Sequence, residues 1–367
     1  MTTAKGFIFD FMEQYDYENL FLCQEKSLGL KAIIAIHDTT LGPAAGGVRM
    51  WTYDTEADAI KDALRLARGM TYKWAASGAN MGGGKCVVIG DPRRDKSEGL
   101  LRALGRFMQR LDGLFLAGPD VGTNMRDMEI LRTETPYVVF TPESWGGPGE
   151  PSPATAFGVV QGMRACLKEV YGSPDLQGRS VAVQGVGEVG EHAVKLLVDG
   201  GAIVTIADLV GEKVERLAAQ YDVKLAHPEE IHALNVDVYC PCALGAVIND
   251  QTLPELRCKI ICGSANNQLA EDHHGNLLAR RGILYGPDYI VNAGGAIIGA
   301  DSLYPGGFNR ERAMESVSRI YETMEKVIAL SKAQNIPTYR AADMLAEQRI
   351  AMARQVKSLA TKAELSA

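Results

Sequence analysis

A glycine-rich segment, Gly185-Val-Gly187-Glu-Val-Gly190, is the feature that most restricts what this chain can fold into. It directly follows the apolar run 181–184, which is typical of a buried strand, and it opens a segment with helical spacing. In such a unit the first glycine permits a tight turn, the second lets the backbone approach a pyrophosphate, and the third lets helix and strand pack closely. The segment predicts a dinucleotide site, with a purely structural turn as the alternative. The expected binding residues here are Gly185, Val186, Gly187, Glu188, Val189 and Gly190.

An acidic residue supports this interpretation and bears on the choice of cofactor. Asp208 ends the next predicted strand, 203–207, about 20 residues after Gly187. A carboxylate in that position accepts hydrogen bonds from the adenosine ribose and repels a 2′-phosphate. Since Leu209 and Val210 offer no cation for such a phosphate, the sequence favours NAD over NADP.

Strands and helices alternate through the second part of the chain, which indicates βαβ units and a parallel sheet. We expect helices over 154–171 and 188–198, and further strands over 236–239, 259–262, 283–285 and 289–291. Before this part lies the segment 142–153, whose prolines and glycines cannot continue a helix or a sheet. It marks a domain boundary, with a surface loop inside one domain as the alternative.

The first part of the chain and its C-terminal end also show clear local patterns. Apolar runs predict strands over 31–37 and 87–89. Helical spacing predicts helices over 55–70, with Thr55 as N-cap, and over 99–111, 310–332 and 341–362. The fold class is therefore α/β with two domains.

Composition limits the classes of function. The 367 residues are 46% hydrophobic and 23% charged, which is ordinary for a soluble globular protein. A net charge of -7 argues against a nucleic-acid partner, and no apolar run approaches the roughly 18 residues of a membrane helix. Seven scattered cysteines fit a reducing cytoplasm. No metal site is expected, because Cys240-Pro-Cys242 lacks a second pair at ligand spacing. The six histidines match no motif and are expected to be structural, with His273 and His274 in a polar, exposed segment.

Two lysines lie in unusual surroundings. Lys73 ends the segment GMTYK, and Lys85 follows three glycines in NMGGGK. A phosphate-binding loop would need glycine at Ala79 and a hydroxyl at Cys86, so that alternative fails. Consecutive glycines would let the backbone approach a small ligand with Lys85 at its edge.

With these segments the sequence resembles the NAD-dependent amino-acid dehydrogenases, in the leucine/phenylalanine/valine/tryptophan dehydrogenase branch of the glutamate dehydrogenase superfamily. The resemblance covers nearly the whole chain, and the motifs occur in the same order. They are LGPAAGGVRMW (41–51), GMTYK (69–73), MGGGK (81–85), PDVGT (119–123), PSPATAFGV (151–159), GVGEVG (185–190), PCALGA (241–246), GSANNQL (263–269), PDYIVNAGG (287–295) and IPTYRAADMLAE (336–347).

The resemblance implies roles for single residues. Lys73 binds the substrate carboxylate, Lys85 is the catalytic lysine, and Asp120 is its acidic partner. Asn266 or Asn267 contacts the substrate or the nicotinamide, with the choice left open. The further cofactor-binding residues that it implies are Thr155, Cys242, Ala243, Asn267 and Asn292.

It also implies the architecture and the partners. An N-terminal α/β oligomerisation and substrate domain would span 1–148 with the C-terminal helix of about 335–367. A Rossmann-type NAD-binding domain would span 149–334, with a cleft between the two. The partners are an L-amino acid, its 2-oxo acid and ammonia, and the chain forms a homo-oligomer, an octamer or a dimer.

The implied reaction is reversible oxidative deamination. Hydride leaves the substrate Cα for the nicotinamide, and water then attacks the resulting imine, so the site needs a base. Desolvation and a second ammonium nearby both favour the neutral, basic form of a lysine such as Lys85. A hydroxy-acid dehydrogenase would need a His–carboxylate pair, and a non-catalytic NAD-binding regulator would not need both lysines and Asp120.

Substrate choice depends on the side-chain pocket. The family's pocket positions fall at Ala45, Gly46, Met70, Gly118, Ala296 and Gly299. Leucine-preferring members carry larger residues at four of these, namely Ala45, Gly118, Ala296 and Gly299. Because interiors are close-packed, smaller residues predict a larger pocket and a bulky or aromatic substrate such as phenylalanine or tryptophan. The alternative is a leucine- or valine-type enzyme whose neighbouring side chains, such as Met50 or Ile297, fill the space.

Overall fold

The computed structural model describes residues 7–364, and the side chains of residues 8–356. These residues divide into two compact units. Unit 1 comprises Met1–Glu150, Gly299–Phe308 and Ala346–Ala367, and unit 2 comprises Pro151–Ile298 and Asn309–Leu345. The predicted domain ranges also include residues 1–6 and 365–367, which lie outside the described residues, and they stay a prediction.

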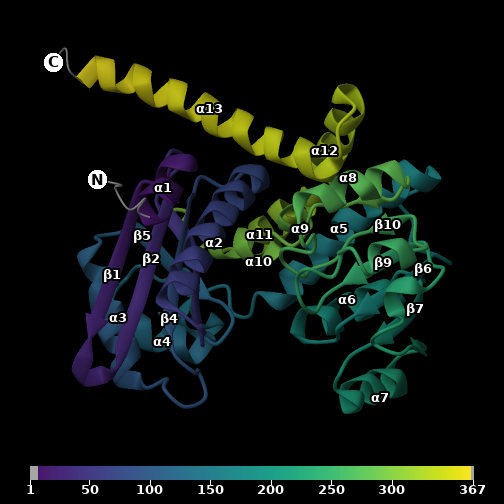
Figure 1. The fold of residues 1–367 in the computed structure, drawn as a ribbon, viewed down its shortest axis with the longest axis horizontal. Helices are drawn as coiled ribbons and strands as arrows, with labels where there is room; N and C mark the ends of the chain where they lie inside the picture. The colour runs from purple at the N-terminus through teal and green to yellow at the C-terminus, as the bar shows by residue number, and fades with distance from the viewer. Residues whose placement is uncertain (1–6, 365–367) are drawn as a thin grey trace, which may run out of the picture. The chain divides into compact units, whose positions relative to one another are not determined.

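The described part of unit 1 contains a five-stranded mixed sheet in the order β1-β2-β4-β3-β5 (Figure 1). β1 pairs antiparallel with β2 and β2 with β4, whereas β3 lies parallel to both β4 and β5. This order brings the C-terminal ends of β3 and β5 to the same edge. The strands are β1 Asn19–Glu25, β2 Leu30–Asp38, β3 Ala44–Trp51, β4 Gly82–Ile89 and β5 Phe115–Pro119.

Helices cover both faces of this sheet. α2 (Glu56–Ser77) buries its alanine-rich stripe against Ile33, Ala35 and Val87, and Thr55 caps its N-terminus as predicted. On the other face, α3 (Glu98–Arg110) and α4 (Met125–Glu134) bury leucines and methionines against a second core. The shorter elements are α1 Phe7–Gln14 and the 3₁₀ helices η1 Lys26–Leu28 and η2 Glu143–Trp145.

The three consecutive glycines before Lys85 serve packing, not a loop around a ligand. They lie inside β4 and are buried. A Cβ on Gly83 would collide with Thr71 of α2, and one on Gly84 would lie 2.8 Å from the Phe115 ring. Glycine there lets α2 and the Phe115 ring of β5 lie unusually close to β4, which corrects the sequence-based interpretation.

The described part of unit 2 contains a six-stranded parallel sheet in the order β11-β10-β9-β6-β7-β8. This is the strand order of a Rossmann fold, whose direction of winding reverses between β6 and β9. The strands are β6 Ser180–Gln184, β7 Ile203–Ala207, β8 Lys224–Leu225, β9 Val238–Pro241, β10 Ile260–Ile261 and β11 Leu284–Tyr285.

The helices of this part follow the expected alternation with two exceptions. The range 289–291, predicted as a strand, is the short helix α9 (Asp288–Val291). The range 310–332, predicted as one helix, divides at Arg319 into α11 (Arg310–Ser318) and α12 (Ile320–Gln334). The other helices that begin in unit 2 are α5 Ser152–Tyr171, α6 Glu188–Asp199, α7 Gly211–Gln220, α8 Asp272–Arg280, α10 Gly294–Asp301 and α13 Thr338–Glu364, with the 3₁₀ helices η3 Ile231–Ala233 and η4 Leu253–Glu255. The last residues of α10 and α13 belong to unit 1.

The causes of these exceptions are local. β-branched and aromatic residues at 289–291 favour a strand, but Pro287 is the N-cap of a helix that begins at Asp288. At Arg319 the ψ of −6° tightens the helix without any proline or glycine to signal it.

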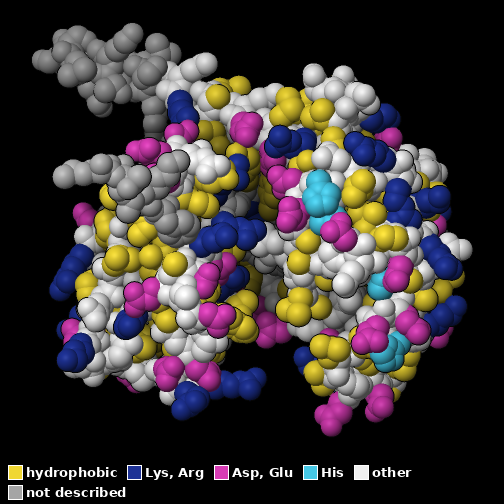
Figure 2. Space-filling view, in the orientation of Figure 1, with side chains coloured by type: hydrophobic (Ala, Val, Ile, Leu, Met, Phe, Trp, Pro, Cys, Tyr) yellow, Lys and Arg dark blue, Asp and Glu magenta, His cyan; other side chains and the backbone are white. Residues whose placement is uncertain are grey.

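The surface bears on the classes of partner. No helix within residues 7–364 has the length and hydropathy that a membrane span requires. On the face drawn in Figure 2, basic and acidic side chains are interspersed among hydrophobic ones.

Candidate active site

A buried ion pair lies at the centre of the unit 1 sheet. Lys85 of β4 is 5% exposed, and its Nζ lies 2.7 Å from Oδ2 of Asp120, which directly follows β5. β3 runs between these two strands, and Gly47 lies on it. A Cβ on Gly47 would lie 2.6 Å from Asp120 Cβ and 3.1 Å from Lys85 Nζ. Glycine at this position therefore leaves the space that the pair occupies.

Arg49, which the sequence analysis did not single out, is a third member of this cluster. Its Nε donates to the same Asp120 Oδ2 at 2.9 Å, and its NH1 donates to Asp62 at 3.0 Å. The Tyr53 hydroxyl also donates to Asp62, at 2.6 Å. Arg49 lies two residues after Gly47 and therefore on the same face of β3. This spacing of two residues could have indicated from the sequence that Arg49 points towards the Lys85–Asp120 pair.

The two cations determine the ionisation of Asp120. Burial alone would raise the pKa of this carboxyl, but Lys85 and Arg49 outweigh it and lower the pKa to about 2. Asp120 is therefore ionised at neutral pH. The cluster holds the Lys85 nitrogen and a carboxylate in hydrogen-bond contact, an arrangement suited to proton transfer to a bound substrate.

Lys73 and Met70 lie on α2, and both are half-buried. The residue after Lys73 is Trp74, whose Nε1 donates to the carbonyl of Ala45 at 2.9 Å. Ala45 and its neighbour Gly46 are buried on β3. The structure thus links the helix that carries Lys73 to the strand that carries two of the predicted pocket residues.

Phe140 fills the space next to two predicted pocket glycines. A Cβ on Gly118 would lie 2.9 Å from Phe140 Cδ2, and one on Gly299 would lie 2.6 Å from Cε2 and Cζ of the same ring. Phe140 is 7% exposed, and its segment pairs with β5, where Val139 N donates to Ala117 O at 2.9 Å. The Phe140 ring thus occupies space beside both glycines, which argues against the expected gain in pocket volume there.

In unit 2 the glycine-rich turn has the geometry that a dinucleotide needs. Gly185 has a φ of +92°, a left-handed conformation that favours glycine. No atom lies within 4 Å of a Cβ built on Gly187, so the space next to it is open. A Cβ on Gly190 would collide with the Gly185 carbonyl, so glycine there lets the helix pack closely on the turn. α6 begins after Gly187 without a side-chain cap, so its first N–H groups face the turn and can bind an anion. Val186 lies in this turn, and Glu188 and Val189 lie in the first turn of α6.

Asp208 is tied to the same turn. Its Oδ2 accepts from Val186 N at 2.8 Å and its Oδ1 accepts from Val210 N at 2.9 Å. A carboxylate has about four acceptor positions, so capacity is left for the two ribose hydroxyls. Leu209 is 85% exposed beside it. The Asp208 carboxylate thus offers hydrogen-bond acceptors to the adenosine end of a cofactor. The next three residues, Leu209, Val210 and Gly211, carry no positive charge.

The loops that follow β9 and β10 carry the other predicted cofactor residues. Cys242 N donates to Gln184 O at 2.7 Å, and Ala243 contacts Gly185, so the loop after β9 borders the glycine-rich turn. The hydrogen bond from Cys240, whose Sγ lies 3.6 Å away, lowers the pKa of the Cys242 thiol to about 7. Asn267 has a φ of +52° and accepts from Ala246 N at 2.7 Å.

Asn292 provides a polar group that fits a nicotinamide or an amino group. Its Nδ2 donates to Asn266 Oδ1 at 2.8 Å and to Ser264 O at 3.1 Å. Its Oδ1 is buried, and no described residue donates to it. A buried acceptor left in this state is costly unless a ligand donates to it. Gly295, which follows Asn292 by three residues, donates from its N to Thr155 Oγ1 at 3.1 Å. The next residue, Ala296, is half-buried on α10.

The chain is similar to amino-acid dehydrogenases in both sequence and fold. Residues 22–137 match the family model of the Glu/Leu/Phe/Val dehydrogenase dimerisation domain, and residues 146–215 and 209–358 match that of Glutamate/Leucine/Phenylalanine/Valine dehydrogenase. Leucine dehydrogenase of Geobacillus stearothermophilus is 53% identical over 351 residues, 96% of this chain and 95% of that protein. Phenylalanine dehydrogenase of Thermoactinomyces intermedius is 46% identical over 94% of each chain. The structure of L-tryptophan dehydrogenase from Nostoc punctiforme has a TM-score of 0.82 and 40% identity, covering 95% of this chain and 99% of that one.

Proposed function

Because the chain belongs to the Glu/Leu/Phe/Val dehydrogenase family of NAD(P)-dependent amino-acid dehydrogenases, we propose that it deaminates a branched-chain aliphatic L-amino acid, leucine or valine, with NAD as acceptor. The products are the 2-oxo acid, ammonia and NADH. The buried Lys85–Asp120 pair is the observation that carries the reaction type, and Phe140 is the one that carries the substrate class.

The substrate class follows from the volume around Gly118 and Gly299. Two positions that lack side-chain atoms would by themselves enlarge the pocket. The Phe140 ring occupies that space. An aliphatic substrate side chain can pack against this ring, whereas a substrate phenyl or indole group would overlap with it. Leucine dehydrogenases are 50% to 54% identical to this chain, and this likeness supports the same substrate class. The aromatic preference expected from the sequence is therefore replaced by its alternative.

The acid–base steps are assigned to unit 1. When bound, NAD accepts the hydride that leaves the substrate Cα. The Lys73 ammonium binds the substrate carboxylate and so orients the Cα–H bond. In its neutral form, Lys85 takes a proton from the water that attacks the imine. Asp120, ionised between two cations, balances the charge and exchanges protons with the leaving amine.

The preference for NAD rests on Asp208 and its neighbours. The Asp208 carboxylate is fixed by two backbone N–H groups and accepts from ribose hydroxyls, whereas a 2′-phosphate would meet its negative charge. Asn292 Oδ1 offers an acceptor for a carboxamide or amine N–H. The assignment of Asn266 or Asn267 to the substrate stays a prediction.

Assembly and location complete the proposal. The family model matched by residues 22–137 is that of a dimerisation domain, which supports a homo-oligomer built through unit 1. Seven free thiols support a cytoplasmic location.

A substrate panel tests the proposal. NADH formation is followed with NAD and L-leucine, L-valine, L-phenylalanine and L-tryptophan, and with the matching 2-hydroxy acids as controls. We expect kcat/KM for leucine or valine to exceed that for phenylalanine by at least about tenfold. A preference for phenylalanine or tryptophan would refute the substrate class, and activity with the hydroxy acids alone would refute the reaction type.

A further inference from the structure

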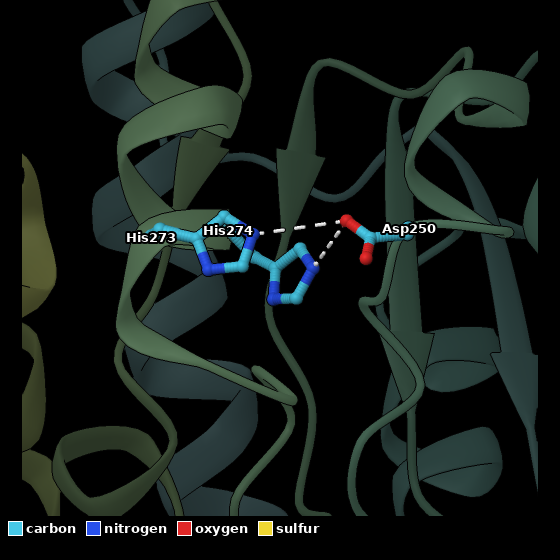
Figure 3. Close-up of side chains that lie close together, drawn as sticks. All are labelled: Asp250, His273 and His274. Carbon is cyan, nitrogen blue, oxygen red and sulfur yellow. Dashed lines mark hydrogen bonds and ion pairs between the residues drawn. The ribbon is translucent and has the colours of Figure 1, made fainter.

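Two adjacent histidines and a carboxylate from another loop meet on the surface of unit 2. His273 and His274 lie in the first turn of α8, and Asp250 lies in the turn after the loop that follows β9 (Figure 3). Figure 2 shows histidine side chains next to acidic ones on this unit. From the sequence the pair is expected to be exposed and structural, but His274 is only 2% exposed. Neither family motifs nor local spacing indicated this cluster, because Asp250 is distant in sequence.

The donor atoms converge on one point. His274 Nε2 lies 3.1 Å from Asp250 Oδ1 and His273 Nε2 lies 3.7 Å from the same oxygen. All three potential ligand atoms lie within 4.8 Å of one another. In a tetrahedral site with metal–ligand bonds of about 2.1 Å, ligand atoms are about 3.4 Å apart. The two separations to Asp250 Oδ1 are close to this value, so small side-chain rotations would complete the site.

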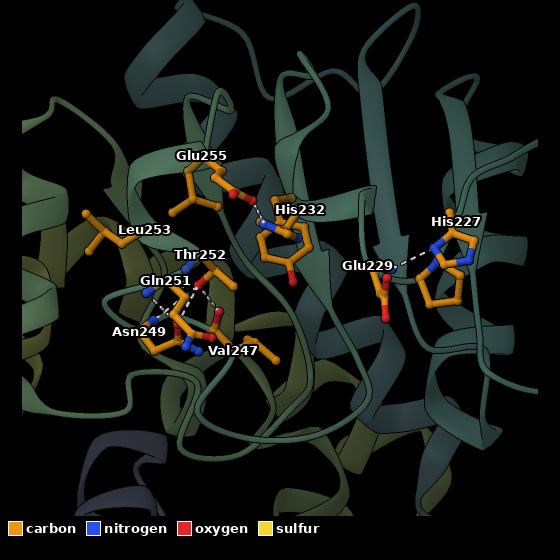
Figure 4. A network of polar contacts seen from close by, with 12 residues as sticks. His227, Glu229, His232, Val247, Asn249, Gln251, Thr252, Leu253 and Glu255 are labelled. Carbon is orange, nitrogen blue, oxygen red and sulfur yellow. Dashed lines mark hydrogen bonds and ion pairs between the residues drawn. The ribbon is translucent and has the colours of Figure 1, made fainter.

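The surrounding structure orients each ligand. His274 Nδ1 accepts from Glu271 N at 3.0 Å, and this bond holds the ring with Nε2 towards Asp250. A metal bound at Nε2 would replace the proton that this nitrogen shares with Asp250. The turn that carries Asp250 is held by Asn249, whose Oδ1 accepts from Gln251 N at 2.9 Å and from Thr252 N at 3.0 Å (Figure 4). Glu271 Oε2 lies 3.9 Å from His273 Nδ1 and adds negative charge.

We propose that Asp250, His273 and His274 form a binding site for a divalent transition-metal ion, Zn²⁺ above all. Two imidazole nitrogens and one carboxylate oxygen suit Zn²⁺, Co²⁺, Ni²⁺ or Cu²⁺, whereas Ca²⁺ and Mg²⁺ select oxygen ligands. Asp250 is 84% exposed and His273 is 52% exposed at the side chain, so solvent reaches the site and supplies the remaining ligand.

One effect opposes the site and is outweighed. The N-terminus of α8 carries the positive end of a helix dipole, worth about 0.5 of a charge. Asp250, Glu271 and Asp272 place three carboxylates around the same turn. Their negative charge exceeds the dipole, so the local field favours a cation.

The proposed ion would join two loops that carry predicted cofactor residues. Asp250 ends the loop that contains Cys242 and Ala243, and the histidines follow the loop that contains Asn267. Backbone bonds already connect these loops, from Ile248 N to Gln268 O at 3.0 Å and from Ala270 N to Ile248 O at 2.9 Å. Zn²⁺ would therefore stabilise this part of unit 2 without taking part in the chemistry.

Calorimetric titration of the untagged, EDTA-treated full chain with Zn²⁺ tests the proposal. We expect one ion per chain, with affinity at least about tenfold weaker in His273→Ala and in Asp250→Asn, since each removes one of three ligands. His227→Ala, which removes an exposed histidine outside the cluster, is the matched control and should bind like the unchanged protein. Both tested side chains are exposed, so the variants keep the fold.

Two further readouts separate this site from adventitious binding. Zn²⁺ should slow amide hydrogen exchange at Ile248 and Ala270 in the unchanged protein but not in His273→Ala. Co²⁺ should give the visible spectrum of nitrogen and oxygen ligands, without a thiolate charge-transfer band. The proposal is overturned by an absence of Zn²⁺ binding, or by binding that both substitutions leave intact.

Discussion

Replacing Phe140 by alanine should change which amino acid the enzyme prefers. A Cβ on Gly118 would lie 2.9 Å from the nearest atom of the Phe140 ring, and one on Gly299 would lie 2.6 Å from it. The Phe140 side chain is buried, at 7% exposure. Its removal leaves a space of roughly one phenyl ring beside two glycines. A substrate phenyl group can take that space, whereas leucine would leave part of it empty.

The magnitudes follow from the volume that is removed. A phenylalanine-to-alanine change in a core costs about 3–5 kcal/mol of unfolding free energy. One methylene in a hydrophobic pocket changes kcat/KM by about 10–200-fold. A whole ring should therefore shift the leucine-to-phenylalanine ratio of kcat/KM by at least about 100-fold towards phenylalanine. The ratio is measured from initial rates of NADH formation, and stability from urea unfolding.

Two further variants make this result specific. Phe107→Ala removes a half-buried ring on α3 away from the predicted pocket, so it should lower stability and leave the substrate ratio unchanged. Gly299→Ala should be destabilising alone, because its Cβ meets the ring, and should be tolerated together with Phe140→Ala. A folded Phe140→Ala enzyme that keeps the original ratio would refute the assignment of this ring to the substrate pocket.

Three other substitutions address the ion cluster and the cofactor turn. Arg49→Gln removes one of the two cations next to Asp120. Because the pKa of this carboxyl is lowered to about 2 in the folded protein, its ionisation stabilises the fold above pH 4, and this stabilisation is lost as the pH falls towards 2. The variant should lose about 1 kcal/mol at neutral pH, and its acid unfolding, followed by circular dichroism, should depend less steeply on pH below 4; an unchanged profile would contradict the pairing. Gly47→Ala should separate Lys85 from Asp120 and lower kcat about tenfold or more with little change in NADH affinity, while an equal kcat would show that the space is not needed. Asp208→Ala should weaken NADH binding about 10–100-fold in a fluorescence titration, and unchanged affinity would reject its role at the ribose.

The Rossmann fold of unit 2 was predictable because its signals are local. A strand, three spaced glycines, a helix and a carboxylate at the end of the next strand are close together in the sequence, and the structure arranges them as β6, α6 and β7 with Asp208 bonded to the turn. Lys85 and Asp120 were found through family motifs. Their contact depends on β3, which runs between their two strands, and no local pattern reports that strand order.

What the sequence did not reveal depends on contacts between distant segments. Phe140 fills the space at Gly118 and Gly299, yet nothing near residue 140 marks it as a pocket residue. The glycines of β4 indicated a ligand loop, since sequence alone does not distinguish close approach to a ligand from close approach to α2. His274 was expected at the surface because its neighbours are polar, but it caps α8 from inside.

Kinetics of Lys85→Ala test the central claim, that Lys85 is the base paired with Asp120, most directly. The variant is assayed with leucine and NAD, and NADH binding is measured separately by fluorescence. The account predicts that kcat falls by about 10²–10⁴-fold, the usual contribution of a general base, while NADH affinity is unchanged. A kcat close to that of the unchanged enzyme would contradict it.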